Sequence, residues 1–159
     1  MISQAIKTRI NKWVAKYPKD QKQSAVMAAL RIVQEDNNGF LTTELMDDVA
    51  EYLNMPKISV YEVATFYSMY EHKPVGKHKI CICTNISCML CGSKSLVQHL
   101  ENKLDIKMGE VTQDGKFSLK QVECLGACVN APMLQIGKTY YENLNKDKLD
   151  LILDDLSNE

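Results

Sequence analysis

The first seventy residues repeat apolar side chains at helical spacing. The first stripe consists of Ile6, Ile10, Trp13 and Tyr17. Its steps of four, three and four residues match one face of an α-helix, and Pro18 ends the pattern. Similar stripes run along residues 26–33 and 45–53, the latter with Thr42 or Thr43 as the expected N-cap. This half of the chain is therefore predicted to be helical.

A fourth helix is expected from about Val60 to Tyr70. Ser59 and Glu62 match the S/T-x-x-E capping box, in which each side chain satisfies a free backbone N–H at a helix start. Phe66 and Tyr67 on this helix are expected to lie mainly in the bundle core, because large apolar residues usually do. A partner-binding face is the alternative.

After a linker with Pro and Gly at residues 72–77, the pattern changes to that of a small α/β layer. The expected elements are a strand at 78–83, a helix near 96–104, hairpins at 110–112/116–122 and 133–136/139–142, and a helix at 149–156. The fold class is thus α+β, with a helical domain over residues 1–73 and a mixed sheet with packed helices over 77–159.

Composition and charge exclude several function classes. The chain has 159 residues, 45% of them hydrophobic, and a net charge of −1, which creates no field that would gather nucleic acid or anionic lipid. No apolar run is long enough to span a bilayer. The N-terminal residues lack the apolar core of a signal peptide. We therefore expect a cytoplasmic protein without nucleic-acid binding or membrane insertion.

Six cysteines stand out because all of them fall between residues 81 and 128. They are Cys81, Cys83, Cys88, Cys91, Cys124 and Cys128. In a protein without an export signal, clustered cysteines favour metal binding or redox chemistry over disulfides. Two loops carry most of them, and Gly92 and Gly126 in these loops would let backbone N–H groups approach sulfur. Three histidines, His72, His78 and His99, have no cysteine at ligand spacing.

Spacing alone leaves several chemistries open. Cys83-x4-Cys88-x2-Cys91 with one distant cysteine matches plant-type [2Fe–2S] ferredoxins, whereas Cys83-x4-Cys88 with Cys124-x3-Cys128 offers a two-plus-two ligand set. Cys88-x2-Cys91 could also be a thiol–disulfide redox pair. Zinc is a poorer match, and inert core cysteines are the remaining alternative.

Longer motifs resemble one known family. They are Cys83-Thr84-Asn85-Ile86-Ser87-Cys88, Gly92 and the run from Glu123 to Pro132, with upstream matches at 39–41, 60–70 and 74–77. From about Tyr17 to Leu156 the chain is similar to the thioredoxin-like [2Fe–2S] subunit of NADH:quinone oxidoreductase (respiratory complex I). This is the 24-kDa subunit of that complex. The resemblance implies an N-terminal helical bundle followed by a thioredoxin-like [2Fe–2S] ferredoxin domain.

The resemblance also implies which residues bind the cofactor. Carried over by position, the ligands of one [2Fe–2S] cluster are Cys83, Cys88, Cys124 and Cys128. The family has no ligand where Cys81 and Cys91 stand. Four polar residues are candidate neighbours of the cluster, although each also suits a turn. They are Thr84, Asn85, Ser87 and Asn130.

The implied function is electron transfer within a proton-translocating NADH:quinone oxidoreductase. FMN and NADH are expected on a partner flavoprotein subunit, which agrees with the lack of a G-x-G-x-x-G motif or P-loop here. The N-terminal helices are expected to dock that partner. The complex would be peripheral on the inner face of the bacterial plasma membrane. The alternatives are an equivalent subunit of an NAD-linked hydrogenase or formate dehydrogenase and, in another class, a thiol–disulfide oxidoreductase using Cys88 and Cys91.

Overall fold

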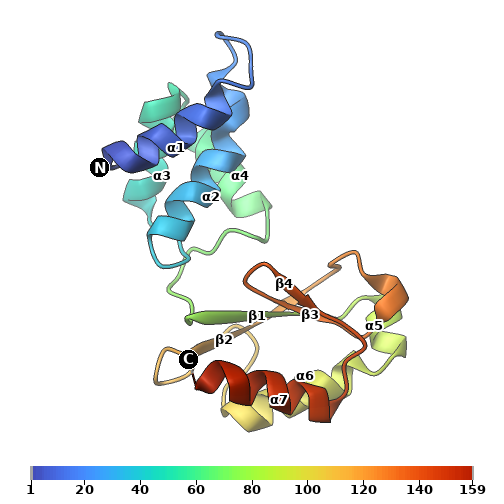
Figure 1. The fold of residues 1–159 in the computed structure, drawn as a ribbon. Coiled ribbons are helices and arrows are strands. Elements are labelled where there is room, and N and C mark those ends of the chain that lie inside the picture. Colours follow the sequence, from blue (N-terminus) through green and yellow to red (C-terminus); the bar gives the residue numbers. More distant parts are fainter. Residues whose placement is uncertain (1, 159) are drawn as a thin grey trace. The chain divides into compact units, whose positions relative to one another are not determined.

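The computed structural model describes residues 2–158 and divides into two compact units, one ending at Pro74 and the other beginning at Val75. All regular elements described in the first unit are helices, and the second unit contains a sheet with packed helices (Figure 1). The predicted fold class is confirmed. Within residues 2–158, no helix combines the length and the apolar character needed to cross a membrane.

The helical unit packs the apolar stripes predicted from the sequence. Its elements are α1 (Gln4–Val14), the 3-10 helix η1 (Lys22–Ala25), α2 (Val26–Asp36), α3 (Thr43–Leu53) and α4 (Lys57–Phe66). Ile10 from α1, Leu30 from α2 and Val49 from α3 are all fully buried in one core. Burial of such side chains contributes about 2 kcal/mol each to stability.

Two predictions about helix starts have different outcomes. Thr42 is the N-cap of α3, and its hydroxyl accepts a hydrogen bond from the N–H of Leu45 at 3.3 Å, as expected. The prediction that Ser59 and Glu62 form a capping box at the start of this helix is wrong, because α4 begins at Lys57, directly after Pro56. Proline suits a helix start, since its fixed φ fits there and its missing N–H is not needed.

The end of α4 also differs from the prediction. The helix stops at Phe66, and the chain leaves the helical period before Tyr70. Phe66 is therefore 80% exposed and Tyr67 lies at the surface, so their predicted place in the core is wrong. Tyr70 is buried; its hydroxyl donates to the carbonyl of Met27 at 2.8 Å, and burial raises its pKa to about 12.

The second unit is built on a four-stranded mixed sheet in the order β2-β1-β3-β4. Its elements are β1 (His78–Cys83), α5 (Ile86–Leu90), α6 (Ser93–Leu104), β2 (Phe117–Val122), the 3-10 helix η2 (Cys128–Asn130), β3 (Leu134–Ile136), β4 (Thr139–Tyr141) and α7 (Lys146–Ser157). β1 runs parallel to β2 and antiparallel to β3. The mixed sheet agrees with the prediction.

Helices α6 and α7 cover one face of this sheet (Figure 1). Ile80 and Ile82 of β1 share a core with Leu100 of α6 and Leu149 of α7. The second predicted hairpin is present as β3 and β4, and Asn145 caps α7. The first predicted hairpin is present as an antiparallel bridge between Val111 and Ser118 of β2, with backbone hydrogen bonds on both sides, and β2 also pairs in parallel with β1.

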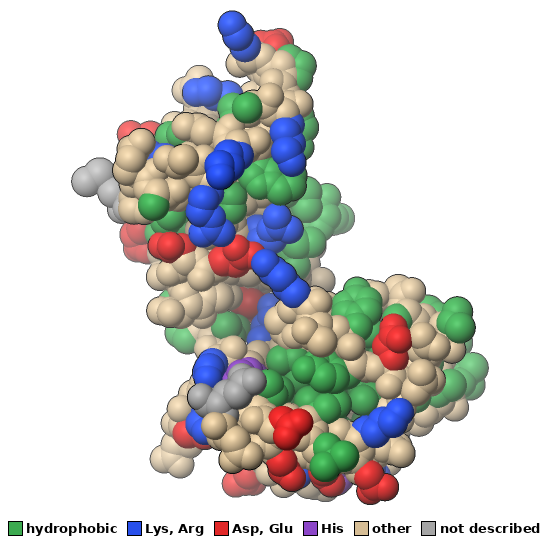
Figure 2. Space-filling model, in the orientation of Figure 1, with side chains coloured by type: hydrophobic (Ala, Val, Ile, Leu, Met, Phe, Trp, Pro, Cys, Tyr) green, Lys and Arg blue, Asp and Glu red, His purple; other side chains and the backbone are tan. Residues whose placement is uncertain are grey.

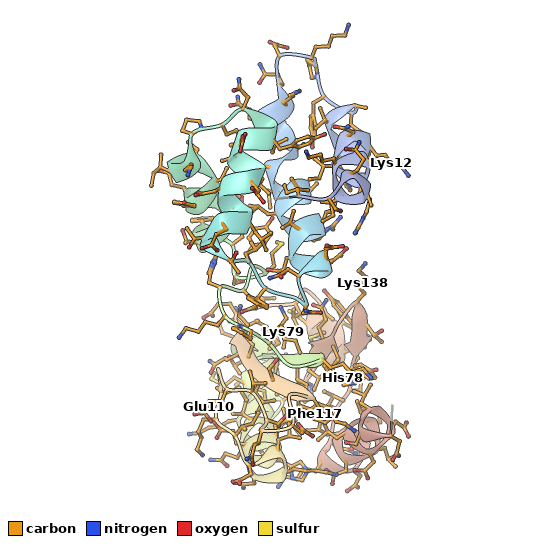
Figure 3. All side chains as sticks on the ribbon, turned by 90° about the vertical axis from the view of Figure 1, so that its left-hand side faces the viewer. Lys12, His78, Lys79, Glu110, Phe117 and Lys138 are labelled. Carbon is orange, nitrogen blue, oxygen red and sulfur yellow. The ribbon has the colours of Figure 1, made fainter. Side chains whose placement is uncertain are left out.

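The entry into β1 requires a glycine. A Cβ added to Gly76 would lie 2.4 Å from the carbonyl carbon of Phe117, closer than real Cβ atoms approach backbone. Directly beyond this point His78 and Phe117 pair across β1 and β2, with ring centroids 5.5 Å apart (Figure 3). The close approach fixes the register of the two parallel strands.

Candidate metal centre

Four of the six cysteines line one pocket at the carboxyl end of the parallel strands. The pocket holds about 160 Å³ and is lined by Cys83, Asn85, Ile86, Ser87, Cys88, Cys124 and Cys128. Because β1 and β2 are parallel and Cys83 pairs with Val122, the chain leaves both strands at the same edge of the sheet. Cys124 follows Val122 by two residues and so lies beside the end of β1.

One half of the pocket belongs to the core. Cys83 and Cys88 are 3% and 2% exposed and pack against buried Met133. Burial, together with a hydrogen bond to Cys83, raises the pKa of the Cys88 thiol to about 11. A reactive dithiol needs the opposite, a lowered thiol pKa. A catalytic thiol must also be accessible, whereas Cys88 is 2% exposed and Cys91 lies outside the pocket, so the geometry does not favour a thiol–disulfide enzyme acting through this pair.

The other half is an exposed loop. Cys124 and Cys128 are both exposed, and the loop between them turns at Gly126, whose φ is +83°. The N–H of Gly126 donates to the sulfur of Cys124 at 3.3 Å, as the sequence predicted for this glycine. The N–H of Gly92 donates instead to the carbonyl of Met89 at 3.0 Å.

The remaining two cysteines do not line the pocket. Cys91 is the exposed C-cap residue of the short helix α5, one turn beyond Cys88. Cys81 is half-buried on β1, and no disulfide joins any of the six cysteines. The plant-type ligand set, which needs Cys91, has no support in this arrangement.

Two residues that secure the site, Tyr140 and Glu142, were not predicted. The Tyr140 hydroxyl donates to the carbonyl of Leu125, between the two exposed cysteines, at 2.8 Å. The Asn130 side-chain N–H donates to the Glu142 carboxylate at 2.8 Å. Of the four predicted polar neighbours, Asn85 and Ser87 line the pocket. Every residue has a backbone carbonyl, so a hydrogen bond to one has no sequence motif. No pattern could therefore have indicated that Tyr140 contacts this loop.

The donor chemistry of the pocket suits an iron–sulfur cluster. Among the described residues, no three His, Cys, Asp or Glu side chains are already arranged as a metal site. The pocket is nevertheless lined by four cysteine thiols and by no histidine. Two of these thiols are buried and two are exposed. A [2Fe–2S] cluster needs four thiolates, two for each iron, whereas a four-thiol set would also satisfy zinc.

A sheet of this topology, with two cysteine pairs converging at its edge, defines a small iron–sulfur protein with an added helical unit. The chain belongs to the thioredoxin-like [2Fe-2S] ferredoxin family, whose model matches residues 10–157. The predicted family is confirmed, and with it one [2Fe–2S] cluster as the cofactor in preference to zinc. The assignment of individual cysteines as ligands stays a prediction.

Curated relatives match nearly the whole chain. The E subunit of the NADH-quinone oxidoreductase of Rickettsia bellii (strain RML369-C) is 47% identical over 146 residues, which cover 92% of this chain and 87% of the relative. The second E subunit of the NADH-quinone oxidoreductase of Rhizobium meliloti (strain 1021) is 45% identical over 140 residues, covering 88% and 82%. These relatives are named as parts of an oxidoreductase, in agreement with the predicted class of activity.

Solved structures with a similar fold include an NAD+-reducing [NiFe]-hydrogenase in the air-oxidized state. The TM-score is 0.71, the identity 18%, and the match covers 86% of this chain. This chain spans only about a quarter, 24%, of the length of that hydrogenase chain. At such low identity the likeness concerns the fold alone.

Proposed function

We propose that this chain is the electron-transfer subunit of an NADH-quinone oxidoreductase, with one [2Fe–2S] cluster held by Cys83, Cys88, Cys124 and Cys128. The observation that carries the proposal is the convergence of these four thiols, and of neither other cysteine, on one pocket. When bound, the cluster supplies reversible one-electron transfer. NADH and FMN belong to a partner flavoprotein subunit.

The chain's own residues bind and shield the cofactor. All four thiols must lose their protons to act as ligands, so binding releases protons and is coupled to local folding. Met133, 1% exposed, excludes water from the side of Cys83 and Cys88. The Gly126 N–H donates to Cys124, and such hydrogen bonds to sulfur tune the reduction potential.

Exposed apolar side chains around the pocket support docking of the flavoprotein at this end of the unit. We call them the pocket rim: Ile86, Met89, Leu90, Val129 and Tyr140. Hydrophobic side chains gather over α5 and η2 in Figure 2. Exposed apolar side chains grouped in one region of a surface are typical of interaction sites. A partner covering the rim would approach the cluster closely enough for electron exchange.

A second apolar patch lies on the helical unit. Phe66, Tyr67 and Met69 are exposed beside one another in sequence, and the first two rings meet edge to face with centroids 5.0 Å apart. This patch supports the docking role that the sequence suggested for the N-terminal helices. As part of the complex, the chain would lie peripherally at the inner face of the bacterial plasma membrane.

Purification of the native complex tests this proposal. We expect the chain to copurify with a flavoprotein that holds FMN and oxidises NADH, and with quinone-reducing subunits. Copurification with a hydrogenase or a formate dehydrogenase would contradict the proposal and support the alternative assembly.

Surface variants test the docking part. Leu90→Ser and Phe66→Ser should each weaken binding to the flavoprotein, since each removes a protruding apolar contact. Leu151→Ser is a matched control, because Leu151 is 66% exposed on α7 and belongs to neither patch. Equal binding by all three variants would refute docking through these surfaces.

A further inference from the structure

The peptide group between Leu125 and Gly126 takes part in two hydrogen bonds at once. Its N–H, from Gly126, donates to the Cys124 sulfur at 3.3 Å. Its carbonyl, from Leu125, accepts from the Tyr140 hydroxyl at 2.8 Å. The two bonds form a continuous chain from a tyrosine hydroxyl through one peptide plane to a cysteine sulfur.

The sheet explains why Tyr140 reaches this peptide. Successive residues of a strand point to opposite faces. Tyr141 of β4 packs against the core under α6 and α7, so Tyr140 points to the other face of the same strand. There its side chain is 47% exposed and contacts the loop after β2.

The neighbouring residues hold the far end of the same loop. The Asn143 N–H donates to the carbonyl of Asn130 at 2.8 Å, and the Asn130 side chain donates to Glu142. Residues after β4 thus fix η2 while Tyr140 fixes the turn before it. Among these contacts, only the one from Tyr140 ends on the peptide whose N–H meets sulfur.

Hydrogen bonds in such a chain strengthen one another. A donor at the carbonyl polarises the peptide, so its N–H becomes a better donor at the opposite end. Donation to a ligand sulfur stabilises the added negative charge of the reduced cluster. The hydroxyl of Tyr140 also restrains rotation of the peptide at Gly126, since glycine limits its own backbone less than any other residue does.

We propose that Tyr140 is a positioning residue for the cluster, acting through the Leu125–Gly126 peptide to orient and strengthen the hydrogen bond to Cys124 and so raise the reduction potential. This inference rests on the proposed function, because it requires Cys124 to be a ligand. Tyr140 itself does not touch the cofactor.

Tyr140→Phe tests the proposal because it removes only the hydroxyl. Tyr141→Phe is the matched control: Tyr141 packs against the core under α6 and α7, and within residues 2–158 its hydroxyl makes no hydrogen bond. The full chain with its reconstituted [2Fe–2S] cluster is used for an electrochemical titration followed by electron paramagnetic resonance. We expect a more negative potential in Tyr140→Phe and an unchanged one in Tyr141→Phe.

A second readout uses the cluster-free full chain. Loss of the hydroxyl should move the amide resonance of Gly126 and speed its hydrogen exchange about threefold to tenfold, as expected for loss of a hydrogen bond worth about 1 kcal/mol. An unchanged Gly126 amide would overturn the hydrogen-bond chain. A shifted amide with a wild-type potential would overturn the tuning role.

Failure of the proposed function would look different. A wild-type chain that assembles no [2Fe–2S] cluster, or a Cys124→Ala variant that keeps the wild-type spectrum, would remove the ligand on which the proposal depends. Either result would overturn the role of Tyr140 at the cluster, even if the Gly126 amide still responded to Tyr140→Phe.

Discussion

Cys83 and Cys88 reach the pocket from the end of a central strand and from a helix, and both are almost completely buried, whereas Cys124 and Cys128 reach it from an exposed loop. The buried pair is held by the packing of the whole sheet unit. The exposed pair is held by a few hydrogen bonds, two of which involve the Leu125–Gly126 peptide. One half of the site is thus part of the core, and the other half is a locally held loop.

This difference separates two kinds of damage. A change to the buried half should affect the stability of the whole unit, because its side chains share a core with the sheet. A change to the exposed half should affect cofactor retention with little effect on the fold, since exposed loops open locally at small free-energy cost. The predictions below test whether the two halves respond in these different ways.

The largest effect is expected from the proposed ligands. Alanine at Cys83, Cys88, Cys124 or Cys128 removes one of four thiolates and should abolish the [2Fe–2S] absorption and electron paramagnetic resonance signals. The buried Cys88→Ala variant should also lower the free energy of unfolding, because it leaves a small cavity beside Met133. Cys124→Ala should unfold like the wild-type chain in its cluster-free form.

Cys91→Ser is the control for this series, because Cys91 is exposed and does not line the pocket. Its cluster signals should equal those of the wild type. Loss of the cluster in Cys91→Ser, with retention in Cys124→Ala or Cys128→Ala, would restore the plant-type ligand set.

A smaller but global effect is expected at Gly76. The added methyl group of Gly76→Ala would press on the backbone of Phe117 and push apart the parallel strands that lead to the pocket. Overpacking of this kind should cost about 3 kcal/mol of unfolding free energy, measured by urea denaturation of the cluster-free chain. Gly109→Ala is the comparison for backbone strain without a clash: a Cβ there meets no atom within 4 Å, but its φ of +91° should still cost about 1–2 kcal/mol, less than the clash at Gly76. Equal stability of Gly76→Ala and wild type would show that the strand entry can relax.

The sequence predicted the buried half of the site better than the exposed half. Helical and alternating periodicities indicate which faces are apolar, so the position of Cys83 at a strand end followed from the pattern. Spacing could not tell that Cys91 lies outside the pocket, because its position depends on where the short helix α5 ends. The contact of Tyr140 with a carbonyl has no sequence signature. Phe66 was misplaced for a similar reason, since its exposure depends on where α4 stops.

The smallest and most local effect is expected at Gly126. Its φ of +83° disfavours any residue with a side chain, while a Cβ there would meet no atom within 4 Å. Gly126→Ala should therefore cost about 1–2 kcal/mol through backbone strain alone. Relaxation of that strain turns the peptide that donates to Cys124, so the cluster should be lost to a chelator about tenfold faster than in the wild type.

Gly115→Ala provides the matched strain at a distance from the pocket, because Gly115 has a φ of +70° and equally open surroundings in the turn before β2. Both variants should lose a similar amount of unfolding free energy in the cluster-free form, yet only Gly126→Ala should release the cluster faster. If the two variants release it at the same rate, general destabilisation explains cluster loss, and the exposed loop is not held independently of the core. If only Gly126→Ala releases the cluster faster than the wild type, the local hydrogen bonds, and not the packing of the unit, control cluster retention on this side of the pocket.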